Sequence, residues 1–144
     1  MKRFFKILLV LFMFVTTPVF ALSDDLFRSD ERVSVSDDLN GSSFVAGNDV
    51  QVDSKVNGML FSAGNSVNQS GESDYLFTAG NIVKVNSQKT KDAYIAGNDV
   101  SVKESDFERD VYVAGNIVTF ESNAGRNVYI GGSKVTISGT INGN

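Results

Sequence analysis

The segment Tyr94-Ile95-Ala96-Gly97-Asn98-Asp99-Val100-Ser101-Val102 is one copy of a motif that recurs along the chain and decides its fold. Its Ala-Gly-Asn core is found five times, and a Gly-Gly-Ser variant follows at 131–133. The central glycines of the six copies are separated by 17, 16, 17, 18 and 17 residues. They are Gly47, Gly64, Gly80, Gly97, Gly115 and Gly132. This period is too short for a helix pair or a propeller blade, and it is typical of one coil of a solenoid of short strands.

Hydrophobic residues alternate with polar or small residues on both sides of each central glycine. The residue three positions after the glycine is always valine: Val50, Val67, Val83, Val100, Val118 and Val135. A third, weaker run consists of Leu39, Val56, Thr90, Phe107, Ala124 and Ile141. Alternation with period two is typical of strands with one buried face. The pattern predicts an all-β fold, a single-stranded parallel β-helix (β-solenoid) of triangular section, with about 17 residues per coil and six to seven coils.

An aromatic residue stands three positions before the glycine in all six copies. We call these residues the aromatic row: Phe44, Phe61, Phe77, Tyr94, Tyr112 and Tyr129. The valines must fill a narrow lumen, and stacked rings would overfill it, so we expect the aromatic row to point outward. A row of this size marks an interaction surface unless something covers it. Two interpretations stay open: the segment with Leu22, Leu26 and Phe27 packs over the row, or the row contacts another copy or a partner.

The glycine and the asparagine of each motif are expected to form a turn ladder. A glycine fits a corner where a Cβ would obstruct the chain, and asparagine tolerates unusual backbone angles and can bond to a neighbouring coil. Stacked asparagines would then form a ladder like those of cross-β structures. The residues are Gly47, Asn48, Gly64, Asn65, Gly80, Asn81, Gly97, Asn98, Gly115 and Asn116.

The N-terminus reads as an export signal. Lys2, Arg3 and Lys6 precede the apolar stretch Ile7–Val15, and Val19-Phe20-Ala21 is a small-x-small cleavage signature. We therefore expect a signal peptide at 1–21, an N-terminal extension at 22–32 and the β-helix at 33–144. The protein is predicted to be exported, to the periplasm, the cell surface or the medium, and an uncleaved N-terminal anchor is the alternative.

Composition excludes several functions. Residues 1–21 hold three of the thirteen basic residues and none of the seventeen acidic ones, so the remaining 123 residues carry a formal charge of −7. Such a chain is unsuited to nucleic acid, whose binding depends on Lys and Arg at phosphates. Cys, His and Trp are absent, which removes disulfides and the commonest general base and metal ligand. We expect no cofactor and no metal.

The repeated pattern, an aromatic residue followed by x-Ala-Gly-Asn-x-Val-x-Val, resembles the bactofilins, a polymer-forming cytoskeletal family, and more closely their exported relatives. Residues 110–116 and 127–137 carry the likeness best, and it extends over about 33–144. The resemblance implies a right-handed β-helix that self-associates end to end without nucleotide and supports the cell envelope. The chain stops at 140–144, partway through a winding, which we expect to leave strand edges that favour assembly.

Catalysis and calcium binding are less well supported by the residues. Glu104, Asp106, Glu108 and Asp110 form a dense acidic stretch, but glycosidases need two carboxyls at set distances, so we interpret it as a solvated corner. Calcium-binding repeats need a nine-residue glycine-rich unit, which is missing. The sequence predicts an exported, non-catalytic structural protein whose partner is itself, an envelope polysaccharide or a membrane protein. The alternative is an adhesin-like module that binds envelope polysaccharide through the aromatic row.

Overall fold

The computed structural model describes residues 25–144, so the predicted signal peptide and Leu22 lie outside the described residues. These residues form six strands and no helix. The strands are β1 (Leu26–Val35), β2 (Ser43–Phe107), β3 (Val111–Ala114), β4 (Ile117–Ala124), β5 (Val128–Gly131) and β6 (Lys134–Ser138). All strand pairs are parallel. The all-β prediction is therefore confirmed.

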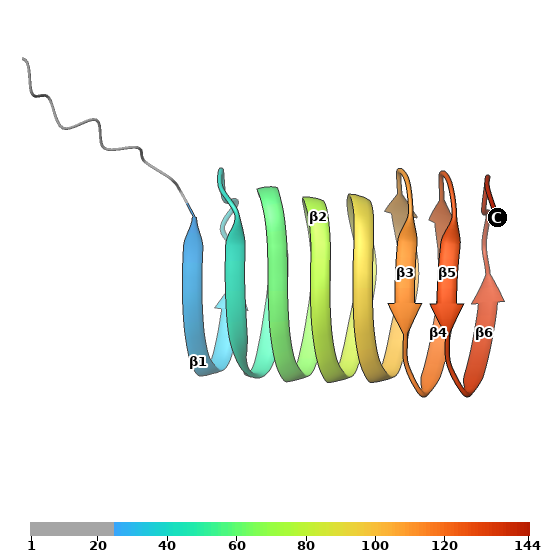
Figure 1. Cartoon of the computed structure of the whole chain (residues 1–144). Helices are drawn as coiled ribbons and strands as arrows, with labels where there is room; N and C mark the ends of the chain where they lie inside the picture. Colours follow the sequence, from blue (N-terminus) through green and yellow to red (C-terminus); the bar gives the residue numbers. More distant parts are fainter. Residues whose placement is uncertain (1–24) are drawn as a thin grey trace, which may run out of the picture.

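Successive passes of the chain lie side by side and wind around one axis (Figure 1). Leu26 pairs with Ser43, Ala93 with Val111 and Val111 with Val128, each step being one coil of 17 or 18 residues. In Figure 1 the chain descends on the near side through β3 and β5 and rises behind through β4 and β6 while it advances, which is a right-handed winding. The fold is a β-solenoid of about seven turns with roughly 17 residues per turn, as predicted.

Aliphatic side chains fill the lumen. Val50, Val67, Val83, Val100 and Val118 are each at most 2% exposed. Within one coil the buried side chains fall into three successive pairs: Ser43 and Val45, Val50 and Val52, Ser54 and Val56. Three inward-facing pairs per coil give the three sides that the sequence predicted. In the last coil Val135 and Ile137 occupy the same columns but are exposed, since that coil has a neighbour on one side only within residues 25–144.

The lumen also contains amide and hydroxyl groups. The Gln69 side chain is buried where neighbouring coils have Val52 and Val85. Its Nε2 donates to Ser62 Oγ, which donates to Thr78 Oγ1 at 2.9 Å. The Gln69 Oε1 atom has no hydrogen-bond partner. This coil therefore holds a buried polar group that the rest of its column lacks.

The β-helix begins at Leu26 rather than at Val33. β1 pairs with β2 along its length, with Phe27 opposite Phe44 and Val33 opposite Val50. The 17-residue period continues through residues 26–32, although Ser29-Asp30-Glu31 replaces Ala-Gly-Asn. Residues 26–32 are thus part of the first coil and not a separate extension. They do not cover the aromatic row.

The third side absorbs the variation in coil length. The register between β2 and β4 shifts between Lys103 and Asp106, within the stretch where the sequence has its one-residue excess. Glu104, in this stretch, has a φ of 51°, in the left-handed region that non-glycine residues rarely adopt. The irregular backbone is confined to this side, so the side that carries the aromatic row stays regular.

Candidate functional site: an apolar face

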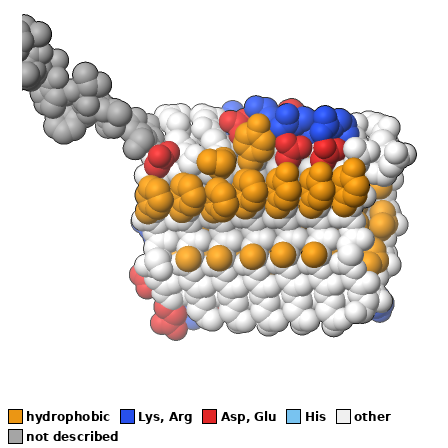
Figure 2. Space-filling model, viewed as in Figure 1, with side chains coloured by type: hydrophobic (Ala, Val, Ile, Leu, Met, Phe, Trp, Pro, Cys, Tyr) orange, Lys and Arg blue, Asp and Glu red, His pale blue; other side chains and the backbone are white. Residues whose placement is uncertain are grey.

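Seven aromatic rings form one continuous stack along the first side of the solenoid. The aromatic row points outward, as predicted, and Phe27 extends it by one ring (Figure 2). Neighbouring centroids are 4.4–4.9 Å apart, and neighbouring planes differ by 2–10°. The distances follow from the strand spacing of parallel sheets, about 4.8 Å, because every ring occupies the same position in its coil.

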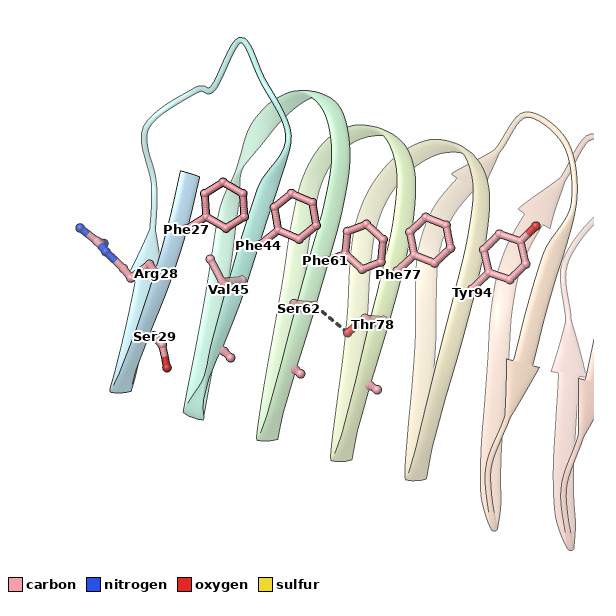
Figure 3. Close-up of a pocket in the computed structure, with 13 residues that line it drawn as sticks. Phe27, Arg28, Ser29, Phe44, Val45, Phe61, Ser62, Phe77, Thr78 and Tyr94 are labelled. Atoms are coloured by element: carbon pink, nitrogen blue, oxygen red, sulfur yellow. Dashed lines mark hydrogen bonds between the residues drawn. The ribbon is translucent and has the colours of Figure 1, made fainter. Parts of the chain in front are cut away.

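The rings stack on one another along the rod. Each interior ring has a stacked neighbour on either side. Figure 3 shows Phe44, Phe61 and Phe77 one after another in this row. Tyr94 and Tyr112 are 42% and 38% exposed, whereas Phe27 at one end is 72% exposed. Burial within the stack raises the pKa of the Tyr112 hydroxyl. Within residues 25–144, only Phe27 and Tyr129 at the two ends have a single stacked neighbour.

A second row of small side chains runs parallel to the aromatic row. It consists of exposed alanines, each two residues after a ring: Ala46, Ala63, Ala79, Ala96 and Ala114. Gly131 takes this place in the coil of Tyr129. We call these residues the alanine row, and both rows together the apolar face. Figure 2 shows them as two parallel bands along the molecule.

The difference in height between the two rows creates a shallow groove. One part, about 610 Å³, extends from Phe27 to Tyr94 over Ala46, Ala63 and Ala79. The other part, about 690 Å³, continues from Tyr94 to Gly131 and is lined by aliphatic, aromatic and glycine residues without a charge. The groove therefore offers shape and apolar contact, with few groups that could bind a polar ligand.

The predicted turn ladder is a ladder of glycines rather than of asparagine amides. A Cβ on Gly97 would lie 2.9 Å from the Gly80 carbonyl oxygen, and a Cβ on Gly115 would lie 3.0 Å from the Gly97 oxygen. The side chains of Asn48, Asn65, Asn81, Asn98 and Asn116 are exposed, and within residues 25–144 no hydrogen bond joins one of these amides to the next. The coils are already joined here by backbone bonds, such as Asn116 N–H to Asn98 O at 3.0 Å.

A corner of paired charges, which the sequence analysis did not predict, lies beside the aromatic row. Arg109 donates to Asp92, and to the Tyr75 hydroxyl at 3.3 Å. One coil further along the rod, Arg126 donates in the same way to Asp110 of the coil before it. Figure 2 shows these basic and acidic groups along one edge of the apolar face. The sequence holds one signal for these pairs: Arg109 follows Asp92 by 17 residues, and Arg126 follows Asp110 by 16 residues. Such a spacing, close to the period of the repeat, places the opposite charges in adjacent coils.

The Asp110 carboxylate is the best-anchored acidic group of this corner. The hydrogen bond from Arg126 holds its pKa below the usual range, and the Asn127 backbone N–H, 3.1 Å away, acts in the same direction. Asp106 accepts from Asn123 Nδ2 at 3.1 Å, while Glu104 and Glu108 are exposed. The acidic stretch is thus divided among separate contacts. Within residues 25–144, no cluster of three or more Asp or Glu could hold a metal ion.

No helix of the described part of the chain is long and apolar enough to span a bilayer. In comparisons with known proteins, no family model, curated protein or solved structure matches this chain. The functional argument therefore depends on the geometry of the apolar face.

Proposed function

We propose that this chain is an exported, non-catalytic structural protein, a bactofilin-like β-helix rod that associates with itself and so builds or coats a structure of the cell envelope. The observation that carries the proposal is the apolar face. Seven rings and five alanine methyls lie in two uninterrupted rows. A contiguous apolar patch of several hundred Å² is typical of a protein interaction surface.

The surroundings of the face favour a protein partner of similar shape. The face has a length of about 30 Å, because its rings repeat at the strand spacing of about 4.8 Å. It is straight, regular and almost free of charge, although residues 22–144 carry a net charge of −7. Among the residues that line the groove, Arg28 at the Phe27 end is charged and the others are not. A charged rod with one nearly uncharged face is suited to pack against another rod along that face.

The covered ring faces distinguish this function from polysaccharide binding. A sugar packs its C–H groups on the face of an aromatic ring, where the π-electron density lies. In the aromatic row the interior faces are occupied by neighbouring rings at 4.4–4.9 Å. This geometry favours self-association over the adhesin-like alternative, and end-to-end assembly stays a prediction from the family resemblance.

Sedimentation velocity and negative-stain electron microscopy of the purified protein test the proposal. We expect assemblies that grow with concentration, and we expect Tyr112→Ser to reduce them. Ile117→Ser is the matched control, because Ile117 is 40% exposed, close to the 38% of Tyr112, but lies outside the apolar face. Protein that stays monomeric at every concentration would contradict the proposal, and monomers that co-sediment with cell-wall glycan would support the adhesin-like alternative.

A further inference from the structure

We infer that the apolar face pairs two copies of this chain side by side with both rods pointing in the same direction, the aromatic row of each lying on the alanine row of the other. The inference rests on the proposed function and specifies the partner, the surface and the orientation. It follows from the unequal heights of the two rows.

The first step is symmetry. Most homodimers are related by a twofold axis, which brings the same surface of both copies together. For a flat face on a rod, that axis can be perpendicular to the rod, which makes the rods antiparallel and places rings on rings. It can instead be parallel to the rod, which keeps the rods parallel and places the rings of one copy over the alanines of the other.

The second step is packing. Phe77 and Ala79 lie two residues apart on the same outer side, about 7 Å from each other along the strand. Rings placed on rings would hold the two alanine rows apart and leave a gap between them, and a gap forfeits contact with the opposite wall. Rings placed over alanines fill the groove of both copies. Such interlocking rows are what give paired sheets a dry interface.

The third step is charge. Beyond the aromatic row lie Arg109, Arg126 and their acidic partners, and beyond the alanine row lie the neutral asparagines of the turn ladder. The charged pairs lie in the C-terminal half of the face, so an antiparallel arrangement would place them against the first coils of the partner, where residues 41–42 and 58–59 at the same corner are uncharged. The parallel arrangement places them against the neutral amides of the turn ladder, so neither arrangement brings like charges together and the packing of the two rows decides the orientation.

The size of the face determines the expected strength. A length of about 30 Å and a width of about 15 Å give roughly 450 Å² per copy, at the lower end of specific interfaces. Single pairs should therefore form only at high protein concentration. Rods that also assemble lengthwise would present many such faces together and associate more tightly.

Distances between spin labels test the orientation, since the chain has no native cysteine. Gln51→Cys, Lys84→Cys and Thr119→Cys place one label each on the same column of three coils, outside the apolar face. In the parallel pair, the label-to-label distance is the same at all three sites. In an antiparallel pair the component of this distance along the rod differs by at least about 19 Å between the site with the largest and the site with the smallest separation, because each step spans two coils of about 4.8 Å.

Substitution in the alanine row tests the surface. Ala79→Arg should weaken dimerisation at least tenfold while every ring remains, and Ile82→Arg, an exposed position of the same coil outside the face, should change it less than twofold. Circular dichroism checks that both variants keep the β-helix, and Ala63→Leu is a milder second variant. Unequal label distances overturn the parallel pair, and unweakened association of the alanine variants overturns the surface. Both results leave self-association intact, whereas absence of any association overturns the proposed function itself.

Discussion

The Cα of Gly64 lies so close to the carbonyl oxygen of Gly47 in the preceding coil that a Cβ on Gly64 would be 2.7 Å from that oxygen. Both groups belong to the backbone, so neither can move without shifting a coil. The same contact recurs at Gly80, whose Cβ would lie 2.6 Å from the Gly64 oxygen. Glycine is needed here for close approach of two coils, because none of these residues has a positive φ.

Gly64→Ala should therefore lower the free energy of unfolding by about 1–3 kcal/mol, the usual cost of forcing an extra carbon into a packed region. Gly131→Ala is the matched control, since a Cβ there meets nothing within 4 Å and completes the alanine row. We expect that control to change stability by less than about 0.5 kcal/mol. Urea unfolding followed by circular dichroism measures both, and equal costs would refute the close-approach argument.

Removing a ring from the middle of the aromatic row should cost more than removing one from its end. Phe77 stacks on Phe61 and Tyr94, and Phe27 stacks on Phe44 alone. Each aromatic pair contributes about 0.5–1.5 kcal/mol beyond area burial, so Phe77→Ala should lose two such contributions and Phe27→Ala one. Chemical denaturation of both variants checks this order, and a larger loss for Phe27→Ala would speak against a cooperative stack.

The buried amide of Gln69 should lower stability. Its Oε1 has no partner, and an unsatisfied buried acceptor costs about 1–3 kcal/mol. Gln69→Leu, of similar size, should raise the free energy of unfolding by about 1 kcal/mol, while Ser62 still donates to Thr78. The reverse change in the same column, Val85→Gln, should lower the free energy of unfolding. Thermal and urea unfolding measure both changes, and a loss of stability in Gln69→Leu would contradict this account.

Acid should destabilise the protein partly through Asp110. Its pKa is lowered in the folded state, first by Arg126, so its contribution to stability is complete above the unfolded pKa of about 3.9 and is lost as the pH falls through that value toward the folded pKa. Asp110→Asn should therefore show a weaker loss of stability below about pH 4 than the wild type. The control Asp99→Asn removes an exposed carboxylate of another side. Parallel pH profiles for Asp110→Asn and the wild type would contradict the linkage.

The coil and its lumen could be predicted because each coil repeats the same inward positions. Six valines at one position, with period-two alternation on either side, admit one arrangement in which aliphatic groups fill a narrow interior. The outward direction of the rings followed from their size. These features depend on side-chain volume and spacing, which the sequence states directly.

The first coil and the alanine row were harder to predict. An alignment on the Ala-Gly-Asn motif does not detect the first coil, because Ser29-Asp30-Glu31 stands in place of the motif there. The 17-residue spacing is nevertheless kept, since Phe27 precedes Phe44 and Val33 precedes Val50 by that distance. The alanines were part of the motif, but only the geometry of the sheet places them beside the rings on one outer face. The Arg109–Asp92 pair depends on the register at the irregular third side, which spacing alone does not determine.

Within residues 25–144, the strands of each coil pair only with the coil before it and the coil after it. Stability in such folds is approximately a sum over repeats and their nearest-neighbour contacts. A gene that duplicates or deletes one 17-residue unit would therefore lengthen or shorten the rod while keeping its cross-section. Each added unit brings one more ring and one more methyl group to the apolar face. The number of repeats would therefore set the area over which two rods associate.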